Sequence, residues 1–228
     1  FSIFPWDKVT EKSTGFDMGC GSGRWAKLLA PKVGKLHCID PSSALEIARR
    51  NLVEMDNCFF HKNGVDEKIL PDASQDFGVS LGVLHHIPDT AAGIKSCSQM
   101  LKPGAPFLLY LYYALDNRPL WFRLLWQLSD AIRSITSKLP HSLRYIVSQI
   151  IALVVYWPFA RVSRVLERVG LPESLISLVP LSTYRSLSFY TIRTDALDRF
   201  GTRLEQRFTK RQISEMMSNA GLENIIFS

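Results

Sequence analysis

Asp17 and the glycine-rich loop that follows it form the most specific chemical pattern in the chain. After a short apolar run ending in Asp17-Met18, glycines stand at alternate positions, Gly19, Gly21 and Gly23, and a helical stretch follows. Glycine permits backbone angles that a side chain forbids and lets the main chain approach a ligand closely. A helix start adds unpaired N–H groups and a partial positive charge. The loop is therefore predicted to hold an electron-rich ligand group. A carboxylate at Asp17 would repel a pyrophosphate but would suit the ammonium of an amino-acid-like cofactor.

The spacing of this loop separates two classes of cofactor. A dinucleotide fingerprint reads G-x-G-x-x-G, with an acid roughly 20 residues further on. This chain reads G-x-G-x-G, and Arg24 stands where the third dinucleotide glycine would be. The run Asp17-Met18-Gly19-Cys20-Gly21-Ser22-Gly23 closely resembles motif I of class I S-adenosylmethionine (SAM)-dependent methyltransferases, in particular the small-molecule type 11-like subgroup. The resemblance implies SAM as the cofactor, bound by Asp17, Gly19, Cys20, Gly21, Ser22 and Gly23.

A second acid, Asp40, ends the next apolar run, Lys35 to Asp40. In an open α/β sheet, ligands bind beyond the carboxyl ends of the strands. Asp40 is therefore predicted to accept both ribose hydroxyls, with Pro41 and Ser42 beside it in the cofactor site. The alternative is a surface aspartate that opens a turn.

The turn after the third predicted strand, Cys58 to Lys62, departs from the resembled family. In that family the turn reads Gly-Asp-Ala, the acid bonds the adenine amino group, and the next backbone N–H bonds the ring. Here Gly64 occupies the acidic position, which leaves Asn63 or Asp66 as substitutes. A backbone contact from Val65 is the preferred prediction, and Gly64, Val65 and Asp66 are included in the predicted site.

The run Leu81-Gly82-Val83-Leu84-His85-His86-Ile87-Pro88-Asp89 resembles the family's loop after the fourth strand. The resemblance implies backbone contacts from Leu81 and Gly82 to the methionine part of SAM, and an acceptor that faces the residues after them. His85 and His86 are the candidate general bases, because histidine titrates near neutrality and a hydroxyl or ammonium acceptor must lose a proton. The pair could instead cap the helix or hydrogen-bond the loop.

Three residues near the end of the fifth predicted strand, Phe107 to Tyr113, are candidates for the acceptor pocket: Tyr112, Tyr113 and Asp116. The tyrosines could equally be core residues of the strand. The chain has no Asn-Pro-Pro-Tyr or Asp-Pro-Pro-Tyr run after the fourth strand. In the resembled families such a run marks amino methylation of nucleobases or glutamine, so this chemistry is disfavoured.

Alternation of strands and helices up to Tyr113 predicts an α/β fold with a doubly wound, mostly parallel sheet. We expect a SAM-binding core over residues 1–116, an all-helical cap insertion over 117–199, and a C-terminal helix and strand over 200–228. Two local signals refine this scheme. Ser43 with Glu46, and Thr209 with Gln212, predict capping boxes at the starts of two helices.

The central segment is predicted to contain helices at Trp121–Ile135, Leu143–Tyr156 and Phe159–Val169, followed by a return loop from Thr191 to Gly201. Pro158 is expected to end the longest apolar run, which then falls short of the roughly 20 residues that cross a bilayer. No transmembrane helix is predicted.

The positive charge of the chain is concentrated in this central region. The formal net charge is +6, and residues 117–211 hold 15 Lys and Arg against 6 Asp and Glu. Arg161, Arg164 and Arg168 share one helix face, opposite an apolar one. One interpretation is a cap whose arginines lie in water. The other is a cap that handles an amphipathic or anionic acceptor and touches an anionic membrane surface.

The last predictions concern the two ends of the chain and its four cysteines. Leu222–Phe227 is predicted as a sixth strand, and because only Ser228 follows, the seventh strand usual in the family is expected to be missing. The four cysteines form no C-x-x-C pair, so reduced thiols, no metal site and a cytoplasmic location are expected. The first residues do not read as a signal peptide.

Three classes of function fit these patterns. The first is a SAM-dependent methyltransferase that acts on a small-molecule or lipid-like acceptor. The alternatives are a catalytically silent SAM-binding module and an NAD-dependent oxidoreductase on a similar sheet. No nucleic-acid partner is expected, because the basic segment lacks an aromatic stacking platform on a sheet.

Overall fold

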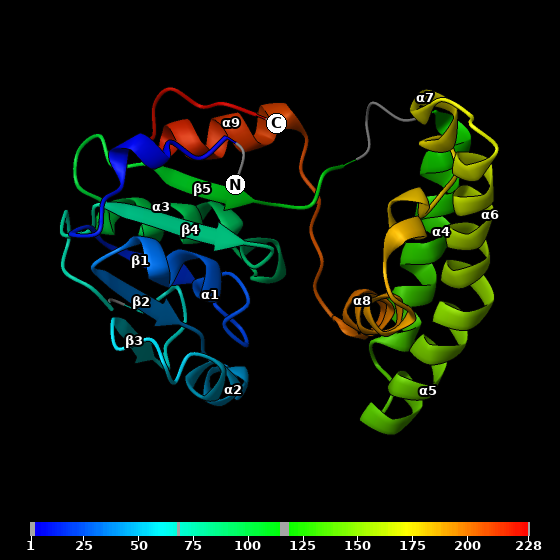
Figure 1. Cartoon of the computed structure of the whole chain (residues 1–228), viewed down its shortest axis with the longest axis horizontal. Helices are drawn as coiled ribbons and strands as arrows, with labels where there is room; N and C mark the ends of the chain where they lie inside the picture. Colours follow the sequence, from blue (N-terminus) through cyan, green and yellow to red (C-terminus); the bar gives the residue numbers. More distant parts are fainter. Residues whose placement is uncertain (1–2, 68, 115–118, 228) are drawn as a thin grey trace. The chain divides into compact units, whose positions relative to one another are not determined.

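The computed structural model describes residues 3–67, 69–114 and 119–227, and the chain divides into two compact units (Figure 1). The α/β unit comprises Phe1–Ala114 and Gln206–Ser228. The helical unit comprises Leu115–Glu205.

The α/β unit is built on one parallel sheet of five strands, in the order β3-β2-β1-β4-β5. The strands are β1 (Thr14–Met18), β2 (Lys35–Ile39), β3 (Cys58–His61), β4 (Phe77–Leu81) and β5 (Phe107–Tyr110). The doubly wound α/β prediction is confirmed, and the sheet is wholly parallel among the described residues. Parallel strands buried on both faces need helices on both sides.

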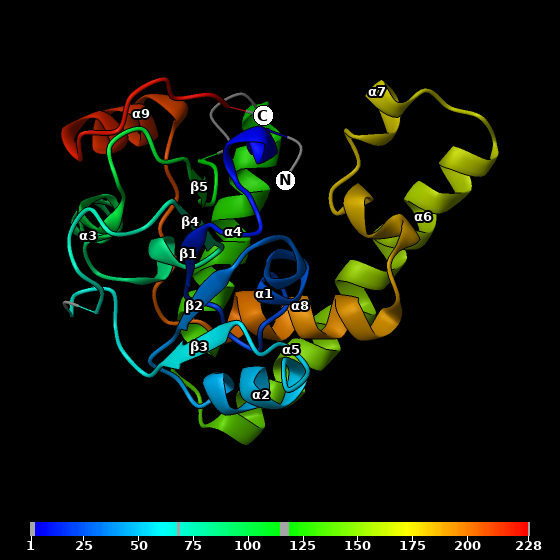
Figure 2. The same cartoon turned by 60° about the vertical axis from the view of Figure 1, so that its left-hand side comes forward.

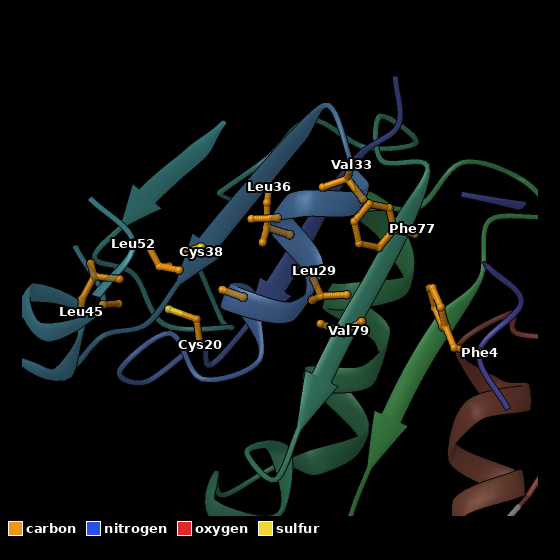
Figure 3. Packing of buried hydrophobic residues seen from close by; sticks show 13 residues of the cluster. Phe4, Cys20, Leu29, Val33, Leu36, Cys38, Leu45, Leu52, Phe77 and Val79 are labelled. Atoms are coloured by element: carbon orange, nitrogen blue, oxygen red, sulfur yellow. The ribbon is translucent and has the colours of Figure 1, made fainter. Parts of the chain in front are cut away.

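Helices cover the two faces of this sheet (Figure 2). The first face carries α1 (Ala26–Leu29) and α2 (Ala44–Asn51), and the second carries α3 (Thr90–Met100) and α9 (Lys210–Asn219). Figure 3 shows the core of the first face, where Leu29, Leu36 and Phe77 are fully buried. Each layer therefore excludes water from one side of the strands that carry the predicted site.

Of the two predicted capping boxes, one is confirmed and the other is wrong. Thr209 and Gln212 form the reciprocal pair at the start of α9, as expected. The prediction for Ser43 and Glu46 is wrong, because the Ser43 side chain makes no capping bond. The Ser42 hydroxyl instead accepts from the Ala44 N–H, at 3.2 Å. The same hydroxyl donates to the carboxylate of Asp40, so Ser42 links the start of α2 to Asp40.

The predicted sixth strand is also wrong: Leu222–Phe227 has no strand structure. Gly221 ends α9 with a φ of 81°, and Asn224 has a φ of 52°. A left-handed residue inside the segment breaks the extended backbone that strand pairing needs. On the side of β5 away from β4, the described residues form an isolated parallel bridge between Tyr113 and Phe208.

The described part of the helical unit, residues 119–205, contains seven elements: α4 (Leu120–Thr136), α5 (His141–Ile151), the π-helical turn η4 (Ala152–Tyr156), α6 (Trp157–Arg168), α7 (Glu173–Ile176), the 3₁₀ turn η5 (Ser182–Ser186) and α8 (Phe189–Gly201). The expected return loop at Thr191–Gly201 is wrong, because this segment is α8. Its apolar residues Ile192, Ala196 and Phe200 are four apart and all buried in the core of the unit.

Pro158 does not end the apolar helix, contrary to the prediction. Helical structure runs without a break from His141 to Arg168, through α5, η4 and α6. Proline within a helix lacks a donor and clashes with the carbonyl four residues earlier. The wider π turn of η4 comes directly before Pro158, and such turns relax the ordinary helical register. By length and composition alone, this helix of 28 residues is long and apolar enough to cross a membrane.

Candidate functional site

The strand order places the predicted cofactor loops at one position of the sheet. The chain moves outward from β1 through β2 to β3 and then returns to the other side of β1 with β4. The loops after β1 and β4 therefore leave the sheet from neighbouring strands at the topological switch point. In open α/β sheets this is where ligands bind.

The glycine loop after β1 has the left-handed backbone that the sequence predicts. Gly19, Gly21 and Gly23 have φ values of 77°, 53° and 84°. A Cβ added at Gly19 would meet the Val83 side chain at 2.4 Å, so Gly19 lets this loop pack against the loop after β4. A Cβ added at Gly21 would meet no atom within 4 Å. Gly21 thus presents bare backbone to open space, which suits close approach of a ligand.

Asp17, on β1, is an acid in an apolar environment. Its side chain is buried, and neither carboxylate oxygen accepts a hydrogen bond of normal geometry from the described part of the chain. Burial, and then the nearby charge of Asp40, raises the pKa of Asp17 to about 7, although the backbone N–H of Ala26 opposes the rise. A buried carboxylate without partners is costly unless a cation neutralises it. An ammonium group is the chemical complement that this acid lacks.

Asp40 lies directly after β2 and is held by the loops around it. One carboxylate oxygen accepts the Gly21 N–H at 2.9 Å, and the other accepts the Ser42 N–H at 2.8 Å and the Ser42 hydroxyl at 2.5 Å. These bonds fix the carboxylate beside the glycine loop. Because each ionised oxygen can accept more than one bond, Asp40 keeps acceptor capacity for ligand hydroxyls.

The loop after β4 contains the two candidate bases in different environments. Gly82, with a φ of 81°, turns the chain into η3 (Leu84–His86), a 3₁₀ turn. His85 is fully buried, and its ring stacks on Tyr112 with the centroids 3.8 Å apart. Burial, and then the charges of His86 and Arg207, lowers the pKa of His85 to about 3. His86 is only half-buried. Of the two rings, His86 is thus the one that a solvent-side acceptor can reach.

Two residues after the helical unit support this loop, and the sequence patterns did not single them out. The Gln206 N–H donates to the His85 carbonyl at 2.9 Å, and its side-chain amide donates to the Ile87 carbonyl at 2.6 Å. The Arg207 guanidinium lies over the Tyr112 ring and donates to the Tyr113 carbonyl. The Gln206 bonds span 119 or more positions in the sequence and the Arg207 bond spans 94, so no local motif could reveal them.

The remaining predicted site residues lie in the turn after β3, just past β5 and after Asp40. The Val65 carbonyl accepts the Ser96 hydroxyl at 2.6 Å, which ties the turn to α3, while Asp66 is exposed. Tyr112 and Tyr113 are both half-buried and lie just past β5. Asp116 lies outside the described residues. Pro41, after Asp40, is exposed.

Comparison with known proteins identifies the class of this unit. Residues 16–109 match the family model described as a methyltransferase domain. The solved structure of a SAM-dependent methyltransferase from Thermotoga maritima has the same fold, with a TM-score of 0.50 and 16% identity, covering 96% of this chain and 68% of that one. Residues 16–109 therefore match a methyltransferase domain, and the α/β unit has the fold of solved SAM-dependent methyltransferases.

Two curated proteins resemble part of this chain in sequence. The ubiquinone biosynthesis O-methyltransferase of Stutzerimonas stutzeri is 32% identical over 105 residues, which is 45% of this chain and 44% of that protein. The enzyme of the same name from Alkalilimnicola ehrlichii is 33% identical over 91 residues, 39% of this chain and 37% of that protein. The chain spans less than half the length of the curated relatives it matches.

Proposed function

We propose that this protein is a SAM-dependent methyltransferase that transfers a methyl group to a small-molecule or lipid-like acceptor through an oxygen atom. The observation that carries the proposal is the buried, unneutralised carboxylate of Asp17 next to the left-handed loop at Gly21. The names of the curated relatives support an oxygen acceptor.

The residues of the site fit SAM by their chemistry. Asp17 would neutralise the ammonium of the methionine part, and Asp40 would accept the ribose hydroxyls. Gly21 and Gly82 would allow the backbone to approach the ligand. When bound, SAM supplies a methyl group on a positively charged sulfur, and transfer of that methyl leaves a neutral thioether. The task of the protein is then mostly to hold the acceptor in line with the methyl group.

We assign the role of general base to His86 rather than to His85. The buried ring of His85, with a pKa of about 3, has almost no affinity for a proton at neutral pH. A base works best with a pKa near the working pH and within reach of the acceptor proton. His86 would take the proton of the acceptor hydroxyl as the new C–O bond forms, while His85 and Tyr112 stack beneath it and fix the loop.

A paired substitution tests this assignment. His86→Ala should lower kcat by about 100-fold or more, with SAM affinity unchanged. His85→Phe keeps an aromatic ring stacked on Tyr112 and should retain most of the turnover. The assay follows demethylated product with fractionated lipids and phenolic metabolites as acceptors, and mass spectrometry identifies what gains a methyl group. Equal losses in both variants would refute the assignment of His86.

A folded protein that binds SAM tightly but methylates no acceptor in these fractions would instead support the catalytically silent module.

A further inference from the structure

Besides its small apolar core, the helical unit buries several polar side chains and exposes many large apolar ones. Of the 32 large apolar side chains that are exposed among the described residues, 25 lie in this unit, which is about two fifths of the chain. On α4 the buried positions are Arg133 and Thr136. The same helix exposes Leu124 and Leu128 by 63% and 60%. A helix in water normally shows the reverse pattern.

The long helix from His141 to Arg168 repeats this arrangement. Its buried positions carry small or hydroxyl-bearing side chains at intervals of three or four: Ser148, Ala152, Tyr156, Ala160 and Ser163. Large apolar side chains occupy exposed positions of the helix, among them Ile150, Leu153, Val154, Val162 and Val165. Exposed apolar patches of this extent mark a surface that contacts another apolar phase.

Both α4 and the long helix pack against α8, and Ala152, Tyr156 and Ala160 of the long helix share a core with it. Arg133 donates to the carbonyls of Thr202 and Arg203, each at 3.0 Å, just past the end of α8. Arg193 of α8 donates to the Tyr145 hydroxyl at 2.8 Å. A membrane-spanning orientation would carry α8 and its charged residues into the hydrocarbon, which is costly. The structure therefore favours a helix pair that lies in the plane of a membrane surface.

The charge of these helices indicates which surface they suit. Residues 119–170 contain seven Lys and Arg against two Asp and Glu. Arg161 and Arg168 are exposed, and the Arg161 guanidinium lies 5.3 Å from the centre of the Trp157 ring. Arginine and tryptophan together suit the headgroup region, where one side of a helix is apolar and the other meets anionic lipid.

We propose that the helical unit docks on anionic membranes, with the apolar sides of α4 and of the His141–Arg168 helix inserted in the interface. Docking does not depend on the methyltransferase activity, and it would bring the α/β unit to lipid-like acceptors.

Vesicle sedimentation tests this proposal with the full chain. The protein should bind vesicles that contain phosphatidylglycerol at least tenfold better than vesicles of phosphatidylcholine alone, and binding should weaken as salt rises. Arg161→Glu, Arg164→Glu and Arg168→Glu together should abolish this preference. The matched control is Lys8→Glu, Lys12→Glu and Lys27→Glu, three exposed lysines of the α/β unit, with the same change in net charge.

A second pair of variants tests the apolar contact. Leu128→Ser with Val154→Ser should lower binding to both kinds of vesicle at least tenfold. Val53→Ser, at a 76% exposed site on the α/β unit, should not change it. Circular dichroism checks that each variant keeps its helices.

Fluorescence quenching measures the depth of insertion. With the other tryptophans replaced by phenylalanine, Trp157 should be quenched most by a label near the headgroups. Strongest quenching at the bilayer centre would overturn the in-plane arrangement. A stable dimer that binds no vesicle would overturn the proposal, because the apolar sides would then cover each other. SAM binding, measured on the same samples, reports separately on the proposed function.

Discussion

At the scale of single residues, a substitution of Gly21 can distinguish its effect on backbone strain from its effect on ligand binding. Gly21→Ala costs about 1 kcal/mol of stability for the left-handed backbone. The new methyl group meets no protein atom within 4 Å, so the fold should survive. It would stand where the ligand approaches, and SAM affinity should fall more than tenfold.

Gly104→Ala is the matched control. Gly104 has a φ of 78° and also has open space around it, but it lies in the turn between α3 and β5. The backbone cost is the same, and SAM affinity should not change. Calorimetric titration of both variants measures the difference, and equal loss of affinity would contradict a ligand-facing Gly21.

Asp17 should make SAM binding depend on pH. Its pKa is raised from 3.8 to about 7, so the free protein holds a proton there that the unfolded chain has lost. The unfolding free energy should therefore fall between pH 4 and 7, by about 4 kcal/mol for this group. The ammonium of SAM needs the ionised carboxylate, so affinity should rise roughly fivefold between pH 6 and 7.

Asp17→Asn removes the titrating group while keeping its shape. The variant should be more stable than the wild type at pH 8, should bind SAM at least tenfold more weakly, and should show a flat affinity between pH 6 and 7. Titration calorimetry across this range makes the comparison, and a wild-type affinity that does not change with pH would argue against an ammonium partner for Asp17.

At the scale of elements, Arg133 ties α4 to the residues just past α8 within the helical unit. Its guanidinium is buried, pairs with Asp130 at 2.7 Å and donates to two carbonyls beyond α8. Arg133→Ala leaves those carbonyls without a donor and should cost about 2 kcal/mol.

Hydrogen exchange locates this loss. Amide protection in α4 and α8 should fall at least tenfold in Arg133→Ala, while β1 and β4 keep theirs. Arg123→Ala, at an exposed site on the same helix, should change neither. If protection fell equally in both variants, Arg133 would have no special role in holding α4.

The elements also show how far a sequence reveals its fold. The glycine loop and the five strands of the sheet were predictable from sequence because their signals are local: turn residues and apolar runs of strand length. Helix α8 was not predicted, since its apolar positions Ile192, Ala196 and Phe200 are buried by partners elsewhere in the unit. The passage of the helix through Pro158 depends on the π turn before it, which leaves no mark in the sequence.

The site shows the same difference between local sequence signals and contacts to distant residues. Asp17 and the glycines were predicted, but the role of Gln206 was not, because its partners are at His85 and Ile87. Likewise, two adjacent histidines look equivalent in the sequence. Burial alone separates them, and burial is a property of the folded chain.

At the scale of the whole molecule, the two units differ in how much of their apolar side chains they expose. The α/β unit buries its apolar residues in two cores, one on each face of a parallel sheet. The helical unit has a smaller core and exposes most of its large apolar side chains. The proposed membrane docking would bring the proposed SAM site to an acceptor that resides in lipid.

The most direct test of the account is calorimetric titration of the purified protein with SAM, with its demethylated product and with NAD. We expect saturable binding of SAM and of the product, no binding of NAD, and loss of SAM binding in Asp17→Asn. Binding of NAD in place of SAM, or no affinity for either sulfur compound in a folded sample, would contradict the assignment of the site.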